Sequence, residues 1–144
     1  MADAVSVAKL FSELYEAAGA GRRLGEGIAA QAGQTQARWQ TLWTIGAGPM
    51  TVPQIARRLG VSRQHILRLT NSLADEGLIE SGVNPDHKTS PLLDLTPTGR
   101  EVLDMIDRGA QASNEALLQQ LSDSDVELLR TLLQRFTEIV KSMS

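Results

Sequence analysis

The first third of the chain places apolar and polar residues at intervals that suit amphipathic helices. Apolar positions recur every three or four residues over residues 5–18 and again over 35–45, and Thr35 can cap the second run. Between them, residues 19–27 read GAGRRLGEG and hold four glycines, each costing about 1 kcal/mol relative to alanine inside a helix. We therefore expect a kink, an irregular stretch or a break there. The second predicted helix has an apolar face made of Ala37, Trp39, Leu42, Trp43 and Ile45.

Two shorter helices follow, and a tight turn at Gly60 joins them. Thr51 suits the start of the first, VPQIARRLG, and Ser62 suits the start of the second, SRQHILRLTNSLADEG, which closes at Gly77. Two helices that pack across so short a turn form a helix-turn-helix, although a helical hairpin without any DNA function could share this spacing. The contact between the two helices is predicted to involve Ile55, Ala56, Leu59, Val61, Ile66 and Leu69.

The pattern then changes to short runs that favour β-strands. LIESGV and SPLLDLT are separated by NPDHKT, whose composition favours a turn, so these residues predict a two-stranded hairpin. Thr96 and Pro97 open another helix that runs to about residue 119, and SDSD at 122–125 caps a last helix. A helix-turn-helix followed by a hairpin is a winged helix, so we predict a mainly α fold with a small β-hairpin wing. The last helix carries an apolar seam of Val126, Leu129, Leu133, Phe136, Val140 and Met143.

Charge is distributed unevenly along the chain. The formal net charge is −3, yet residues 27–74 contain five arginines and no acid. Because DNA phosphates meet one face of a protein, this local charge matters more than the net charge. An ordinary solvated helix face is the alternative interpretation. The second helix of the helix-turn-helix carries Arg63, Gln64 and Arg68 away from its inward positions, and such long donors can read base edges or bind phosphates.

Other classes of function find little support in the residues. The chain has no cysteine, which excludes disulfides and thiolate metal sites, and its two histidines are His65 and His87. No nucleophile elbow or phosphate-binding glycine loop occurs, and Asp104 and Asp107 suit a solvated helix face better than a metal site. We therefore expect no enzymatic activity, no cofactor and no metal. No apolar run reaches the length of a membrane span and the first residues form no export signal, so we expect a cytoplasmic protein without membrane contact.

Nearly the whole chain resembles the MarR family of bacterial transcriptional regulators. The resemblance rests on TVPQIARRLGVSRQHILRLTNSLADEGLIE, NPDHKTSPLLDLTPTGREVL and LSDSDVELLRTLLQRF, which occur in the family's order. It implies a homodimer that binds double-stranded DNA at a pseudo-palindromic operator, as a repressor released by a small aromatic or phenolic effector. It implies N-terminal dimerisation helices in 1–34, a DNA-binding region in 35–99 (recognition helix about 62–76, wing about 78–96) and C-terminal dimerisation helices in 100–144. The dimer contacts that it implies are Val7, Phe11, Leu14, Leu129, Leu133, Phe136 and Val140; an intramolecular core is the alternative for the C-terminal seam.

The wing departs from the family's usual pattern. Where the family commonly has an arginine that enters the minor groove, this chain has Thr89, and Pro91 stands where lysine is common; an alignment shifted by one residue would place Lys88 there instead. We therefore expect a wing that mainly contacts phosphates, since lysine fits a narrow groove less well than arginine does. The complete set of expected DNA contacts is Thr51, Arg57, Ser62, Arg63, Gln64, His65, Arg68, His87, Lys88 and Thr89.

An effector pocket is the last expectation. Trp39 and Trp43 lie one helical turn apart, and Arg38 is adjacent, so the three could hold an aromatic carboxylate, although both tryptophans could instead be core residues. Two alternatives to the regulator with an effector stay open. One is a winged-helix adaptor that binds protein, and the other is a family member without ligand control.

Overall fold

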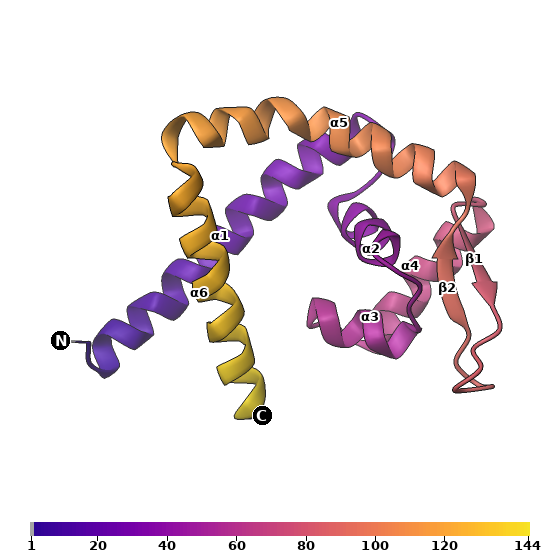
Figure 1. Ribbon diagram of the computed structural model, residues 1–144, viewed down its shortest axis with the longest axis horizontal. Helices are drawn as coiled ribbons and strands as arrows, with labels where there is room; N and C mark the ends of the chain where they lie inside the picture. Colours follow the sequence, from indigo (N-terminus) through magenta and orange to yellow (C-terminus); the bar gives the residue numbers. More distant parts are fainter. Residues whose placement is uncertain (1) are drawn as a thin grey trace. The chain divides into compact units, whose positions relative to one another are not determined.

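The computed structural model describes residues 2–144, which form six helices and one hairpin (Figure 1). The chain divides into two compact units, Met1–Gly109 and Ala110–Ser144, and their boundary falls within the fifth helix. The elements in chain order are α1 (Ala4–Ala30), α2 (Gln36–Gly46), α3 (Val52–Leu59), α4 (Arg63–Asp75), β1 (Ile79–Gly82), β2 (Leu92–Leu95), α5 (Pro97–Gln120) and α6 (Asp123–Ser142). The predicted mainly α fold with a β-hairpin wing is confirmed.

Side-chain caps place the starts of the helices where the sequence predicts them. The hydroxyls of Thr35, Thr51 and Ser62 each accept a hydrogen bond from the backbone N–H three residues later. These bonds satisfy N–H groups that have no partner within the helix. At the start of α1, the backbone N–H of Ser6 donates to the Asp3 carboxylate and lowers the pKa of that carboxyl.

The glycine-rich segment forms part of one continuous helix, so the expected kink or break is wrong. α1 runs through all four of its glycines, and within residues 2–144 left-handed backbone occurs at Gly33, Gly60 and Gly77, none of them in α1 (Figure 1). One glycine has a packing reason: a Cβ on Gly25 would lie 2.8 Å from Cγ of Gln36. The absent side chain lets α1 approach the start of α2, and this packing outweighs the low helix propensity of glycine.

The core of the first unit joins α2, α3, α4, the hairpin and the start of α5. The buried residues of this cluster are Leu42, Ile45, Ile55, Ala56, Ile66, Leu73, Leu78, Ile79, Leu93, Leu95 and Leu103, and Leu59 and Leu69 pack against them half-buried. The predicted helix-turn-helix contact is therefore confirmed except at Val61, which is 41% exposed in the turn.

The buried face of α2 differs from the predicted one. Trp43 is 55% exposed, and Thr41 and Thr44 are buried in its place. Each threonine hydroxyl donates to the backbone carbonyl four residues earlier at 2.8 Å. A threonine can therefore be buried without an unsatisfied hydroxyl, and the bulky indole of Trp43 is left on the outer face.

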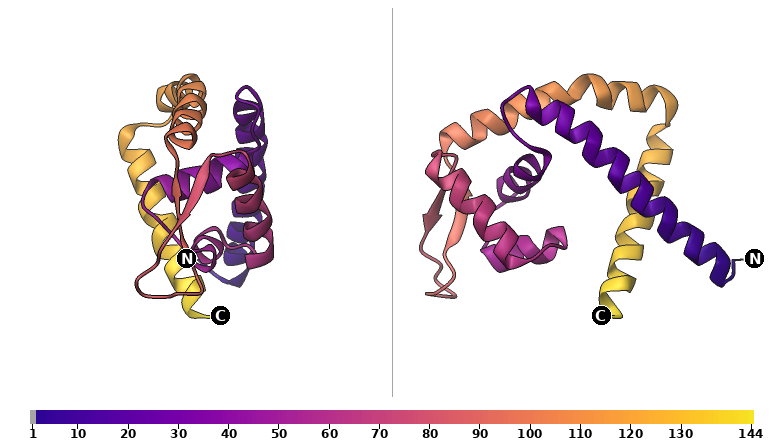
Figure 2. Two further views of the ribbon diagram at one scale, coloured as in Figure 1. Left: turned by 90° about the vertical axis from the view of Figure 1, so that its right-hand side faces the viewer. Right: turned by 180° about the vertical axis from the view of Figure 1, so that it is seen from behind.

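The two strands form an antiparallel hairpin (Figure 2). Its register runs from Ile79 opposite Leu95 to Gly82 opposite Leu92. An isolated bridge between Met50 and Leu93 ties the loop before α3 to the hairpin. The start of α5 comes very close to the chain that leads into β1: a Cβ on Gly99 would lie only 1.8 Å from the carbonyl oxygen of Leu78. This position of the chain therefore requires glycine.

The second unit consists of the end of α5 and all of α6. Ser122 caps the start of α6, as the SDSD sequence predicts, and Asp125 completes a reciprocal capping box there. No residue of α6 is buried. Within residues 2–144, no helix combines the length and the apolar character needed to cross a membrane.

Candidate nucleic-acid interface

The second helix of the helix-turn-helix, α4, presents a polar face to solvent. Arg63, Gln64 and Arg68 are exposed, whereas Ile66, Thr70 and Leu73 on the opposite side are buried. His65 is half-buried, and its backbone N–H donates to Oγ of Ser62 at 3.0 Å. The N-terminal half of α4 can therefore offer long donors to a groove while its inner face holds it on the core.

The arginines of this region are not used in internal ion pairs. Across residues 2–144 the ion pairs are Arg38 with Glu76 and Arg130 with Glu127. Arg57, Arg58, Arg63 and Arg68 are all exposed and take part in neither pair. Their charges are consequently available to phosphates.

A hollow of about 430 Å³, here called the wing cleft, separates the helix-turn-helix from the hairpin turn. Arg57, Arg63 and His87 line it together with Asp86 and Thr51. The structure thus brings together four of the predicted DNA contacts from α3, α4 and the wing. Gln64, Arg68 and Lys88 do not line this cleft, and Thr89 lines a separate hollow between α4 and the hairpin.

Thr51 plays a structural role at the edge of this cleft. Its hydroxyl accepts from the backbone N–H of Gln54, and its own N–H donates to Oε1 of Gln54 at 2.9 Å. These two bonds form a capping box, and Thr51 is only 7% exposed. Thr51 is therefore the N-cap of α3, and it lies beside the cleft that Arg57 and Arg63 line.

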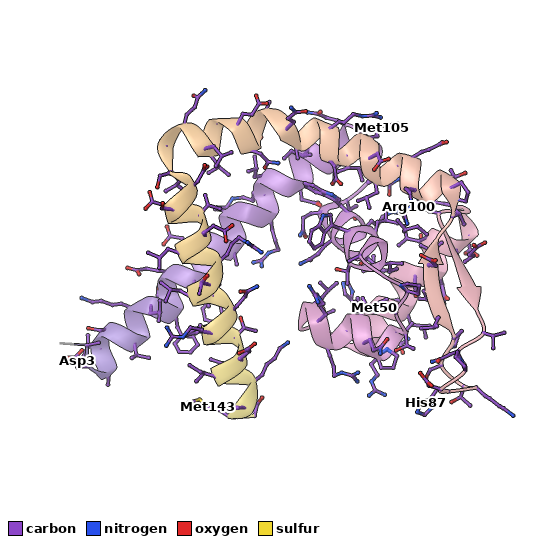
Figure 3. The ribbon with its side chains drawn as sticks, viewed as in Figure 1. Asp3, Met50, His87, Arg100, Met105 and Met143 are labelled. Carbon is purple, nitrogen blue, oxygen red and sulfur yellow. The ribbon has the colours of Figure 1, made fainter. Side chains whose placement is uncertain are left out.

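The wing turn is organised by an asparagine that was not among the predicted site residues. Asn84 is buried, its Nδ2 donates to the carbonyl of Ser90 at 2.9 Å and its Oδ1 accepts from the N–H of Asp86 at 3.0 Å. Asparagine before proline and aspartate is a turn signal, which could have pointed to this role. His87 lies at the far turn of the hairpin (Figure 3), and Lys88 and Thr89 beside it are exposed.

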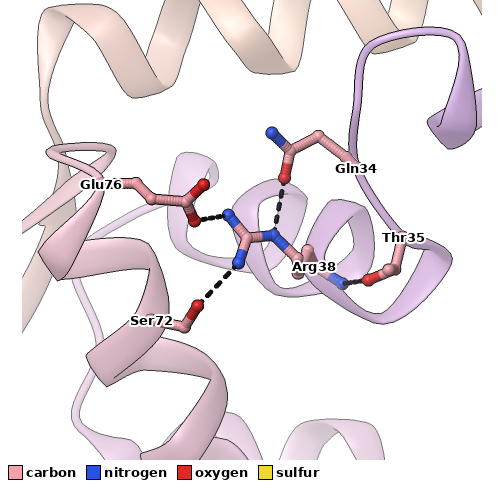
Figure 4. A network of polar contacts seen from close by, with 5 residues as sticks. All are labelled: Gln34, Thr35, Arg38, Ser72 and Glu76. Atoms are coloured by element: carbon pink, nitrogen blue, oxygen red, sulfur yellow. Dashed lines mark hydrogen bonds and ion pairs between the residues drawn. The ribbon is translucent and has the colours of Figure 1, made fainter.

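The predicted effector residues divide between two environments. Trp39 and Trp43 line a hollow of about 250 Å³, here called the tryptophan hollow, with Gly21, Gly25, Gln36 and Gln40. The indole N–H of Trp39 donates to Oδ1 of Asp107 at 2.9 Å. Arg38 does not line this hollow. Its guanidinium instead donates to Gln34 and Ser72 and pairs with Glu76 (Figure 4).

The residues predicted for dimerisation lie on exposed or half-buried faces of α1 and α6. Val7 is exposed on α1, where Phe11 and Leu14 are half-buried and the ring of Phe11 lies 6.3 Å from that of Tyr15. On α6, Leu129 is 53% exposed, Leu133 is exposed, and Phe136 and Val140 are half-buried. Each helix thus carries an apolar face that its own unit does not bury.

Within residues 2–144, no group of three or more His, Cys, Asp or Glu residues could hold a metal ion.

Known proteins resemble this chain in sequence and in fold. A protein-family sequence model described as the MarR family matches residues 32–88. An uncharacterized protein of Mycobacterium tuberculosis (strain H37Rv) is 44% identical over 136 residues, which cover 94% of this chain and 95% of the relative.

Two solved structures align over almost the whole chain. Staphylococcus aureus MarR in complex with salicylate and kanamycin aligns with a TM-score of 0.79 and 18% identity, covering 98% of this chain and 96% of that one. A mutant MarR from E. coli complexed with operator DNA aligns with a TM-score of 0.76 and 22% identity, covering 94% of this chain and 99% of that one. At these identities the likeness shows a shared fold.

Proposed function

The chain belongs to the MarR family of DNA-binding transcriptional regulators, and from this premise we propose that it is a homodimeric repressor of a pseudo-palindromic operator. The observation that carries the proposal is the exposed N-terminal half of α4. There Arg63, Gln64 and Arg68 project from a helix whose opposite side is locked into the core. An exposed helix with long donors near its start suits entry into the major groove.

The wing cleft supports a contact to the DNA backbone on the same face. Arg57 and Arg63 line it from the two helices, and His87 lines it from the hairpin turn. Because neither arginine has an internal ion pair, a phosphate is the natural partner for this charge. In this proposal the wing, through His87 and Lys88, adds affinity while α4 supplies most of the sequence preference.

The proposed dimer explains the apolar faces of α1 and α6. Leucines such as Leu129 and Leu133 are exposed on a helix with no buried residue, and this much apolar surface marks an interface. A second copy of the chain is the proposed occupant, with residues 1–34 and 100–144 as the dimerisation regions around a DNA-binding region in 35–99. Two copies would present two α4 helices to half-sites about 34–36 Å apart.

We further propose that a small aromatic or phenolic molecule releases the DNA by binding in the tryptophan hollow. The S. aureus MarR of similar fold was solved with salicylate, an aromatic acid. The hollow offers two indoles and the amides of Gln36 and Gln40. The sequence suggests Arg38 as the cation for a bound carboxylate. Because Arg38 is paired with Glu76, a carboxylate bound in the hollow would lack that cation.

Fluorescence tests the effector proposal directly, because the chain has two tryptophans and both line the hollow. Candidate phenols and aromatic acids are titrated into the protein while tryptophan emission and the release of bound DNA are followed. The proposal expects both signals to change at the same ligand concentration. The same titration is carried out with Trp43→Phe, in which Trp39 is the remaining tryptophan. A ligand that releases DNA but leaves the emission of both proteins unchanged would contradict the effector proposal.

Selection of bound fragments from genomic DNA tests the regulator itself. The purified chain is incubated with sheared DNA of its host, and the retained fragments are sequenced. A regulator enriches a few fragments that share two related half-sites, whereas a protein-binding adaptor enriches none. The genes beside the enriched fragments would also suggest which small molecules to titrate.

A further inference from the structure

Arg38 lies at the centre of a polar network that connects three parts of the chain (Figure 4). Its Nε donates to Oε1 of Gln34 at 2.7 Å, in the turn before α2. Its Nη1 donates to Oγ of Ser72 at 2.9 Å, and its Nη2 pairs with the carboxylate of Glu76. Ser72 and Glu76 lie 34 and 38 residues further along the chain, in the last turn and at the C-cap of α4. One side chain therefore fastens the C-terminal end of α4 to the start of α2.

The chemistry of this network suits a fixed arrangement. The Arg38 side chain is only 14% exposed, so water competes weakly for its donors. A planar guanidinium can address several acceptors at once in a set geometry, which a lysine ammonium cannot do. Glu76 stands at the C-terminal end of a helix, where the helix dipole disfavours a negative charge. Pairing with Arg38 offsets that cost.

Fixing the C-terminal end of α4 matters because the helix is rigid, so a tilt at that end displaces its N-terminal end. The helix has 13 residues, and at about 1.5 Å per residue it is roughly 20 Å long. Over that length, a tilt of about 5° at one end moves the other end by about 1.7 Å. Good hydrogen bonds need donor–acceptor distances of about 2.7–3.2 Å, so a shift of that size would break contacts between Arg63 and a base edge.

We propose that Arg38 and Glu76 are positioning residues that set the orientation of α4 for base reading, without touching DNA themselves. This inference rests on the proposed function, since it concerns the accuracy with which α4 meets its operator. Arg38, although it belongs to α2, would thus act on the orientation of α4 and would have no role in the tryptophan hollow.

The charge of Glu76 makes the inference distinguishable from simple electrostatics. Glu76→Gln removes a negative charge from a DNA-binding unit, so electrostatics alone predicts tighter binding to every DNA sequence. The positioning role predicts the opposite for the operator, because the neutral amide holds Arg38 less strongly. The side chain of Glu76 is 54% exposed, so the substitution leaves no buried cavity that could unfold the protein.

The experiment compares full-length wild-type chain, Arg38→Gln, Glu76→Gln and the double variant. Two DNA probes are used, a fragment enriched by the genomic selection and a scrambled duplex of the same length. The matched control is Glu80→Gln, which removes the same charge from an exposed glutamate of β1 that takes part in neither ion pair. Thermal unfolding of each variant identifies a temperature at which all are folded, and affinities are measured there.

Glu76→Gln is expected to weaken binding to the enriched fragment by roughly 3- to 30-fold, the range typical of residues that act through a packed element. Its binding to the scrambled duplex should not weaken, the double variant should be no worse than Arg38→Gln, and Glu80→Gln should weaken binding to neither probe. Glu76→Gln that binds the enriched fragment as tightly as wild type, or that loses affinity equally for both probes, overturns the positioning role alone. Wild-type protein that does not distinguish the two probes overturns the proposed function and the inference with it.

Discussion

At the scale of single residues, we propose that Arg63 is the side chain that contributes most to specificity. It is exposed at the first turn of α4, follows the Ser62 cap, and also borders the wing cleft. It can therefore reach either a base edge or a phosphate. The two roles differ in consequence, because base contacts carry sequence information and phosphate contacts set position and affinity.

Replacing Arg63 with alanine is expected to cost about 1–3 kcal/mol of operator binding and to relax the preference at one base pair. The measurement is the affinity for the selected operator and for its single-base variants. Arg135→Ala, an exposed arginine on α6, serves as the control and should bind as wild type does. An equal loss on every sequence would show that Arg63 contacts phosphate instead.

Gly99 is the residue at which the fold tolerates substitution least. A Cβ there would meet the carbonyl of Leu78 at 1.8 Å, and backbone cannot move aside as a flexible side chain can. Gly99→Ala is expected to lower the free energy of unfolding by about 3 kcal/mol or more, the upper range for overpacking. Urea unfolding at one fixed protein concentration checks this, since the stability of a dimer depends on concentration.

At the scale of elements, α1 shows how propensity and packing compete. Its glycines predict a break, yet the helix is continuous, and only Gly25 of those four sits against another helix closely enough to exclude a side chain. Beyond the adjacent residues and the backbone of α1 itself, no heavy atom lies within 4 Å of a Cβ added at Gly27. The two positions read alike in the sequence, and tertiary contacts alone separate them.

Gly27→Ala is accordingly expected to stabilise the protein by up to about 1 kcal/mol, the difference in helix propensity. Gly25→Ala, in the same helix, should instead destabilise it by forcing Gln36 away. Thermal and urea unfolding of the two variants provide the comparison. Equal effects at both positions would mean that α1 does not pack against α2 as described.

The helix-turn-helix and the wing could be predicted because their signals are local. Caps such as Thr51 and Ser62, the left-handed Gly60 and the β-favouring runs on either side of the NPDHKT turn each act within a few residues. The partners of Arg38 could not be predicted, since Ser72 and Glu76 meet it only through the crossing of α2 and α4. The burial of Thr41 instead of Trp43 could not be predicted either. Threonine is polar, but it can be buried once its hydroxyl donates to a backbone carbonyl.

At the scale of the whole molecule, the proposed regulator consists of two copies of the chain. Leu129→Glu combined with Leu133→Glu places two charges on the exposed apolar face of α6 and is expected to convert the dimer to monomers with much weaker operator binding. Sedimentation or light scattering measures the mass. Gln134→Glu adds a charge to the same helix at a polar position and should leave the mass unchanged. A wild-type chain that is already monomeric while it binds DNA would contradict the dimer.

We propose that this mildly acidic chain binds DNA in a sequence-specific way through one basic face. The most direct test is the affinity of the wild-type chain for its selected fragment and for a scrambled duplex, measured across a range of salt concentrations. Both affinities are expected to fall steeply with salt, because arginines such as Arg57 and Arg63 displace counterions from phosphates. The selected fragment is expected to bind at least about 1,000-fold more tightly than the scrambled duplex. A flat salt profile together with equal affinity for both duplexes would contradict sequence-specific DNA binding by this chain.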